Sequence, residues 1–113
     1  MFTVAVPAVF VAPVLEEFFF RAVVLVGVYQ LFRRAVGIGA AATTAVLTSA
    51  GAFVLLHAVG GVLALQDGIQ LFVVGCACAV LVIVTGRIWG AVLAHVVYNA
   101  TYIALLVVGS ALS

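Results

Sequence analysis

Residues 40–65 read AAATTAVLTSAGAFVLLHAVGGVLAL, and this run contains no charged side chain. An apolar stretch longer than about 18 residues is typical of a helix that crosses a bilayer. The rest of the chain is similar, because 69% of its 113 residues are hydrophobic and only 6% are charged. Soluble domains are about half apolar and about a quarter charged. The composition therefore predicts an integral membrane protein that contacts the lipid bilayer.

Charge and cysteine content exclude other classes of function. The chain has a net charge of +1, no lysine and no basic run, so nucleic acid is not a suitable partner. Cys76 and Cys78 lie two positions apart in an apolar run, and residues at that spacing point to different faces of a helix. We expect them to be packing residues, neither a disulfide nor a metal pair.

The apolar runs predict an all-α, polytopic transmembrane helical bundle of about four membrane segments, forming one domain over residues 1–113. The first segment is either one kinked, tilted helix or a short lead-in followed by a span from about Val14. Proline removes a backbone donor, so Pro13 favours a break. A turn is expected at residues 66–68. The first, third and fourth expected segments cover residues 2–32, 69–84 and 88–108. The second begins at residue 40 and ends either shortly after His57 or towards Leu65.

The charges between segments predict an orientation. If each segment crosses once, Arg33, Arg34 and Arg87 fall on one side of the membrane and Asp67 on the other. Positively charged loops prefer the cytoplasm. We therefore expect the arginine side to be cytoplasmic and the protein to reside in the cell membrane. The sequence does not indicate an oligomeric state.

Several polar residues lie inside the apolar segments. The chain has four basic residues, three acidic residues and two histidines. Five of these lie within apolar runs, namely Glu16, Glu17, Arg21, His57 and His95. A charge at the bilayer centre costs ~2.5–3.5 kcal/mol on insertion scales, so such residues usually serve a function. The set predicts a functional site inside the membrane.

The two glutamates are expected to have different roles. Glu17 and Arg21 are four residues apart, the spacing at which helical side chains meet, so they are predicted to form a supporting ion pair. Glu16 is rotated by ~100° to a neighbouring face and has no cation so close in sequence. Glu16 is therefore free to face a cavity.

The same four-residue spacing recurs on two other segments. His95 and Asn99 share one helix face, and Phe53 and His57 share another. The structural alternatives are polar contacts between helices for His95 and Asn99, and a satisfied core histidine for His57. Ser49 is expected to bond to its own helix backbone.

This residue set suits hydrolysis by an activated water. Glu16 can accept a proton from water, and His57 can orient that water or share the proton. His95 and Asn99 can donate hydrogen bonds to the oxyanion of a tetrahedral intermediate. An aspartyl dyad is excluded because Asp67 has no partner aspartate, and the His-Glu-x-x-His helix of zincins is absent.

A zinc site is an open alternative. Glu16, His57 and His95 would form a two-histidine, one-carboxylate ligand set with a fourth position for water. The sequence does not separate a metal-bound water from a carboxylate-bound water.

The motifs together resemble the CPBP family, the CAAX protease and bacteriocin-processing (Abi) family of intramembrane endopeptidases. The family pattern is Glu-Glu-x-x-x-Arg, then Phe-x-x-x-His, then His-x-x-x-Asn. These motifs stand here, without a substitution, at residues 16–21, 53–57 and 95–99. The resemblance covers residues 7–108.

The resemblance implies a helical protease core in which Glu16 activates water with His57. It further implies that His95 and Asn99 stabilise the oxyanion and that supporting residues hold the site, here Glu17, Arg21 and Phe53. The implied substrates are membrane-associated, either CAAX-type prenylated proteins or bacteriocin and other peptide precursors. Family members commonly carry further helices before the Glu-Glu motif, so we expect a minimal or N-terminally truncated core.

Two other functions fit an intramembrane carboxylate. Glu16 could bind protons or cations in a small transporter subunit, and a membrane scaffold without catalysis is the third possibility. Loss of peptide cleavage on mutation of Glu16, His57 and His95 would separate the protease from both.

Overall fold

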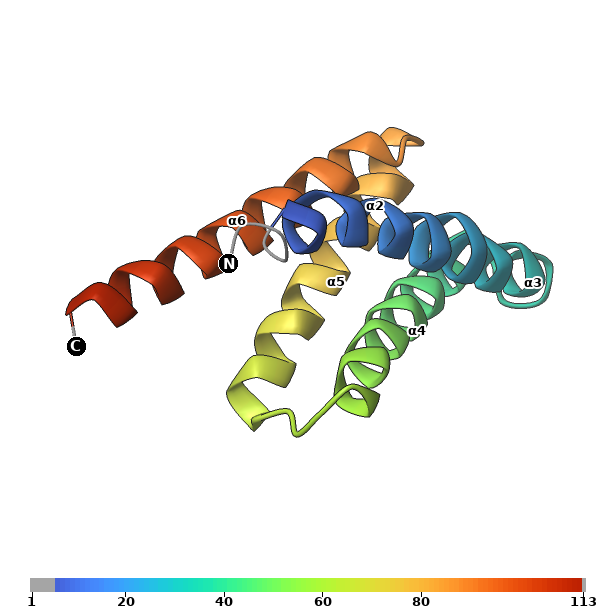
Figure 1. Cartoon of the computed structure of the whole chain (residues 1–113). Helices are drawn as coiled ribbons and strands as arrows, with labels where there is room; N and C mark the ends of the chain where they lie inside the picture. Colours follow the sequence, from blue (N-terminus) through green and yellow to red (C-terminus); the bar gives the residue numbers. More distant parts are fainter. Residues whose placement is uncertain (1–5, 113) are drawn as a thin grey trace.

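The structure is a computed structural model that describes residues 6–112. These residues form helices joined by short connections and contain no strand, which confirms the all-α prediction. The predicted start of the first segment at residue 2 lies outside the described residues. The helices are inclined to one another, and the C-terminal half of the last one projects beyond the others (Figure 1).

The N-terminal part is one continuous helical stretch that alternates between π and α geometry. Its elements are η1 (Pro7–Val11), α2 (Ala12–Glu17), η2 (Phe18–Leu25) and α3 (Val26–Val36). The predicted break near Pro13 is wrong, since the flanking residues at both ends of α2 keep right-handed helical dihedrals. A π-helical turn precedes Pro13, which lies in the first turn of α2, where a missing backbone donor is tolerated.

Helix α4 (Ile38–Val59) follows after a single residue, Gly37. Gly37 has a φ of 83°, a left-handed conformation that glycine adopts without strain, and it reverses the chain between α3 and α4. Helix α4 ends shortly after His57, at the first of the two predicted boundaries, and does not extend to Leu65.

Helix α5 (Leu65–Thr85) begins earlier than predicted. The expected turn at residues 66–68 is its first turn, where the Gly68 N–H donates to the Ala64 carbonyl at 3.0 Å. An acidic residue in the first turn of a helix interacts favourably with the helix dipole, so Asp67 favours this helix start rather than a turn. Gly86, with a φ of 66°, ends the helix.

Helix α6 (Trp89–Leu112) starts within one residue of its predicted position and extends past residue 108. Within residues 6–112, three helices are long and apolar enough to cross a membrane, namely α4, α5 and α6. With the N-terminal helical stretch as a further helix, the fold is the expected helical membrane bundle.

Small residues let α4 and α5 approach closely. A Cβ added to Gly75 of α5 would lie 3.1 Å from the Cα of Ala50 on α4, a separation that forces a shift. Small residues at such positions are typical of helix interfaces in membranes. Leu25, Ala45 and Ala79 form the adjoining buried cluster, which ties the N-terminal stretch to α4 and α5.

Candidate active site

A buried ion pair lies at the centre of the bundle. The Arg21 guanidinium donates from Nε to Glu17 Oε2 at 2.8 Å, and both side chains are fully buried. The four-residue spacing had predicted this pair, and the structure confirms it. The pair neutralises two charges that would be costly to bury alone.

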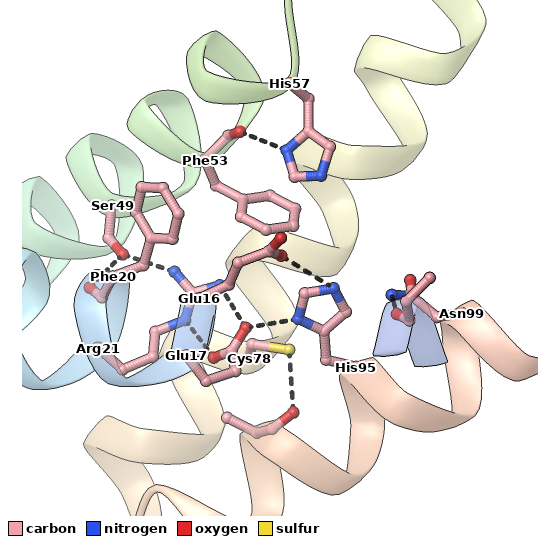
Figure 2. Close-up of polar contacts among 12 residues, drawn as sticks. Glu16, Glu17, Phe20, Arg21, Ser49, Phe53, His57, Cys78, His95 and Asn99 are labelled. Carbon is pink, nitrogen blue, oxygen red and sulfur yellow. Dashed lines mark hydrogen bonds and ion pairs between the residues drawn. The ribbon is translucent and has the colours of Figure 1, made fainter. Parts of the chain in front are cut away.

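Ser49 of α4 connects this ion pair to the backbone of the N-terminal stretch. Arg21 Nη1 donates to Ser49 Oγ, and the Ser49 hydroxyl donates to the Phe20 carbonyl at 2.9 Å (Figure 2). The expectation that Ser49 bonds to its own helix is therefore wrong, although Thr43 does bond in that way. Sequence reasoning missed Ser49 because no local spacing relates it to Arg21.

His95 of α6 contacts both glutamates. Its Nδ1 lies 3.0 Å from Glu17 Oε1, and its Nε2 lies 3.6 Å from Glu16 Oε2. The imidazole is almost fully buried, at 1% exposure. Since Glu17 as a carboxylate only accepts, Nδ1 carries a hydrogen and Nε2 is the atom that faces Glu16. Glu17 thus orients the ring of His95.

Glu16 is the residue with an unsatisfied polar atom. Among the described residues, its Oε2 is the buried side-chain oxygen or nitrogen that has no hydrogen-bond partner. The Glu16 side chain as a whole retains 24% exposure, so the carboxyl group is only partly enclosed by the protein. A buried oxygen without a partner is a position where a water or a substrate group can bind.

His57 is held by its own helix on the other side of the Phe53 ring (Figure 2). Its Nδ1 donates to the Phe53 carbonyl at 2.9 Å, because a carbonyl can only accept. Its Nε2 is then an acceptor in the neutral imidazole. The Phe53 ring contacts both imidazoles, with centroids 4.5 Å from His57 and 5.3 Å from His95 (Figure 2).

The two histidines lie on either side of the Phe53 ring, although they come from different helices. In a bundle of simple full crossings, the two imidazoles could meet only if the segment that carries His57 ran on towards Leu65 or were short or re-entrant. Helix α4 instead ends at Val59 and has 22 residues. Helices α4 and α6 are inclined to one another (Figure 1), and both imidazole rings contact the Phe53 side chain.

Asn99 lies one turn beyond His95 on α6. Its Nδ2 donates to the Ala8 carbonyl at 3.0 Å, which ties α6 to the N-terminal stretch. One N–H of the amide is therefore occupied and one remains for another acceptor. Asn99 and His57 also line one cavity of about 240 Å³, together with Leu63, Asp67, Leu71, Tyr98 and Tyr102.

The three candidate zinc ligands do not converge as placed. Within residues 6–112, no group of three His, Cys, Asp or Glu side chains is arranged to hold a metal ion. Glu16 and His95 face one another, but the Phe53 ring lies between the imidazoles of His95 and His57. These side chains, as arranged, do not fit a zinc site.

The fold and the site define a class, an integral membrane helical protein with a carboxylate–imidazole cluster buried between its helices. A family model for type II CAAX prenyl endopeptidase, Rce1-like, matches residues 1–101. The chain therefore belongs to this family of membrane endopeptidases, which confirms the resemblance to the CPBP family. No curated protein and no solved structure matches the chain.

Proposed function

We propose that this chain is an intramembrane endopeptidase in which Glu16 activates the attacking water. The observation that carries the proposal is the Glu16 carboxyl oxygen Oε2, which is buried, has no hydrogen-bond partner among the described residues and faces His95 Nε2 at 3.6 Å. All three family motifs contribute to this region, from the N-terminal stretch, α4 and α6. We propose that they act as one catalytic unit.

In the proposed reaction, Glu16 accepts a proton as a water oxygen bonds to the carbonyl carbon of the scissile peptide. His57 Nε2 accepts a hydrogen bond from this water and so orients it. The resulting oxyanion accepts hydrogen bonds from the remaining N–H of Asn99 and from Nε2 of His95 in its doubly protonated form, because the Nδ1–H of His95 is already donated to Glu17. The C–N bond then breaks, and the proton held by Glu16 passes to the leaving amine.

Three further residues support the site without touching the reacting atoms. Glu17 orients His95, Arg21 balances the charge of Glu17, and the Phe53 ring separates and packs against the two imidazoles. The proposed substrates are peptides or proteins at the membrane, with prenylated CAAX-type termini first among them because of the family match.

The proposal is tested by cleavage of farnesylated and unmodified CAAX peptides by the full chain in lipid nanodiscs. Glu16→Gln keeps the shape of the side chain but removes the base, so we expect kcat to fall about 10²–10⁴-fold. His57→Ala and His95→Ala should also lose activity. Leu15→Ala, at an exposed neighbouring position, is the matched control. If all three site variants cleave as wild type does, the proposed mechanism fails.

Metal removal gives a separate prediction. Because the proposed mechanism uses a carboxylate-bound water, wild-type activity should persist after chelation, with the metal content of the sample measured alongside. Loss of activity that returns when zinc is added back would replace the glutamate mechanism by a metal-dependent one.

A further inference from the structure

The cavity lined by His57 and Asn99 contains polar groups that the proposed reaction does not use. Asp67, Tyr98 and Tyr102 line it from the start of α5 and from α6. Asp67 is partly buried and has no hydrogen bond or ion pair with any residue that the structure describes. Its carboxylate thus has no side-chain partner among the described residues and lies in a cavity that His57 and Asn99 also line.

No cation of the described chain is near enough to neutralise this charge. Arg21 is paired with Glu17. Arg33 and Arg34 lie in the last turn of α3, and Arg87 follows the end of α5. Asp67 is at the opposite end of α5, so almost the whole helix, ~30 Å, separates it from Arg87. Asp67 is therefore the acidic residue among the cavity's lining residues, and none of those residues is Arg or Lys.

Several of the other polar atoms around the cavity can accept a hydrogen bond, while the second N–H of Asn99 and the Tyr102 hydroxyl can donate. The Tyr98 hydroxyl donates to Gln70 Oε1 at 3.5 Å, which leaves its oxygen lone pairs for a ligand. His57 donates from Nδ1 to the Phe53 carbonyl, and Asn99 donates to the Ala8 carbonyl. Their remaining Nε2 and Oδ1 atoms can accept. A ligand rich in donors would match this set.

We propose that this cavity is a substrate subsite for a positively charged side chain, lysine or arginine, close to the scissile bond. A carboxylate with two phenol rings is a suitable environment for an ammonium or guanidinium group, through an ion pair and contact with the aromatic faces. A metal ion would need more carboxylate or imidazole ligands than one aspartate provides. This inference rests on the proposed function, because His57 and Asn99 belong to both sites.

The position of Asp67 has a structural explanation as well, since an acid in the first turn stabilises α5. That effect requires an acid near the helix start but does not require its side chain to line a cavity. The exposed neighbour Gln66 provides the comparison, because it is in the same turn and is not among the cavity residues.

The test uses the CAAX peptide that wild type cleaves best, with each position flanking the scissile bond set in turn to Lys, Gln or Glu. At one position, wild type should prefer Lys over Glu by about tenfold or more in kcat/KM. Asp67→Asn should abolish the preference and Asp67→Lys should reverse it. Gln66→Lys adds the same charge outside the cavity and should keep the wild-type preference.

Binding of the same fluorescent peptides to Glu16→Gln measures the preference without turnover, so the two proposals can fail separately. Cleavage or binding that is independent of peptide charge at every position would overturn the subsite and leave the endopeptidase intact. A Lys preference that survives in Asp67→Asn would also overturn it. Charge-dependent binding without cleavage by wild type would support the subsite and contradict the proposed function.

Discussion

At the scale of single residues, Glu17 explains how so many polar groups are buried together. Its Oε2 accepts from Arg21 Nε, and its Oε1 accepts from His95 Nδ1 and from Arg21 Nη2. The three polar side chains thus satisfy one another. Breaking a buried pair by removing one partner leaves a costly unpaired charge. Glu16 is the other carboxylate of this cluster, and its Oε2 has no hydrogen-bond partner among the described residues. The proposed chemistry is therefore assigned to Glu16 and not to Glu17.

Ser49 leads to a prediction about a supporting residue. Ser49→Ala removes the acceptor of Arg21 Nη1 and the donor to the Phe20 carbonyl, both in a fully buried region. A buried polar group without its partner costs about 1–3 kcal/mol, so we expect a lower free energy of unfolding. Because Arg21 then holds Glu17 and His95 less firmly, kcat should fall while KM changes little.

The matched control is Thr48→Ala, at the exposed neighbouring position of α4. Thermal unfolding in one detergent and cleavage rates should be measured on both variants. A Ser49→Ala protein with unchanged stability and unchanged kcat would show that the hydrogen bonds of Ser49 do not position Arg21.

At the scale of the helices, the π-helical turns distinguish the N-terminal stretch from α4, α5 and α6. Residues Phe18–Leu25 form η2, which carries both Phe20 and Arg21. Interruptions of this kind often occur at functional sites. Here the Phe20 carbonyl of η2 also accepts a hydrogen bond from α4 through Ser49. The missing backbone donor of Pro13 had predicted a break there instead.

The close approach of α4 and α5 gives a prediction for Gly75. A Cβ at this position would lie 3.1 Å from the Cα and 3.2 Å from the Cβ of Ala50, and backbone atoms retreat only if a helix moves. Gly75→Ala should therefore lower the free energy of unfolding by about 1–3 kcal/mol, and Gly75→Val by more. Thermal unfolding in detergent measures both.

Gly109→Ala in α6 is the comparison, since nothing lies within 4 Å of its added Cβ. In the exposed helix this change should be neutral or slightly stabilising. An equal response of Gly75→Ala and Gly109→Ala would mean that α4 and α5 can separate without loss.

At the scale of the whole molecule, the site forms where the N-terminal stretch, α4 and α6 meet (Figure 2). The C-terminal half of α6 extends away from this meeting point (Figure 1). Its leucines Leu105, Leu106 and Leu112 are more than half exposed. In a bilayer, lipid chains can cover such a surface without cost.

The distribution of arginines predicts the orientation of the molecule. The end of α3, with Arg33 and Arg34, and the α5–α6 connection, with Arg87, should face the cytoplasm, whereas the α4–α5 connection should face outward. A membrane-impermeant thiol reagent applied to intact cells should label Val62→Cys but neither Arg34→Cys nor Arg87→Cys. All three should react after permeabilisation.

The native Cys76 and Cys78 are the internal control for this experiment. Both lie in the middle of α5, where the bilayer should shield them from the reagent. Labelling at positions 34 and 87 from outside intact cells would reverse the predicted orientation.

The sequence by itself determined the membrane class, the approximate helices, and the residues of the three motifs. It also determined the Glu17–Arg21 pair, because both residues lie on one helix at a spacing that brings side chains together. These features depend on composition and on contacts within a few residues, which a linear pattern contains.

Only the tertiary structure decided how these residues meet. Arg21 reaches Ser49 across 28 positions, and His95 reaches Glu17 across 78. The cavity that joins Asp67 to His57 and Asn99 likewise involves three helices. Such contacts depend on the inclination of the helices and on the close approach at Gly75, which follow from packing over the whole bundle and not from any local spacing.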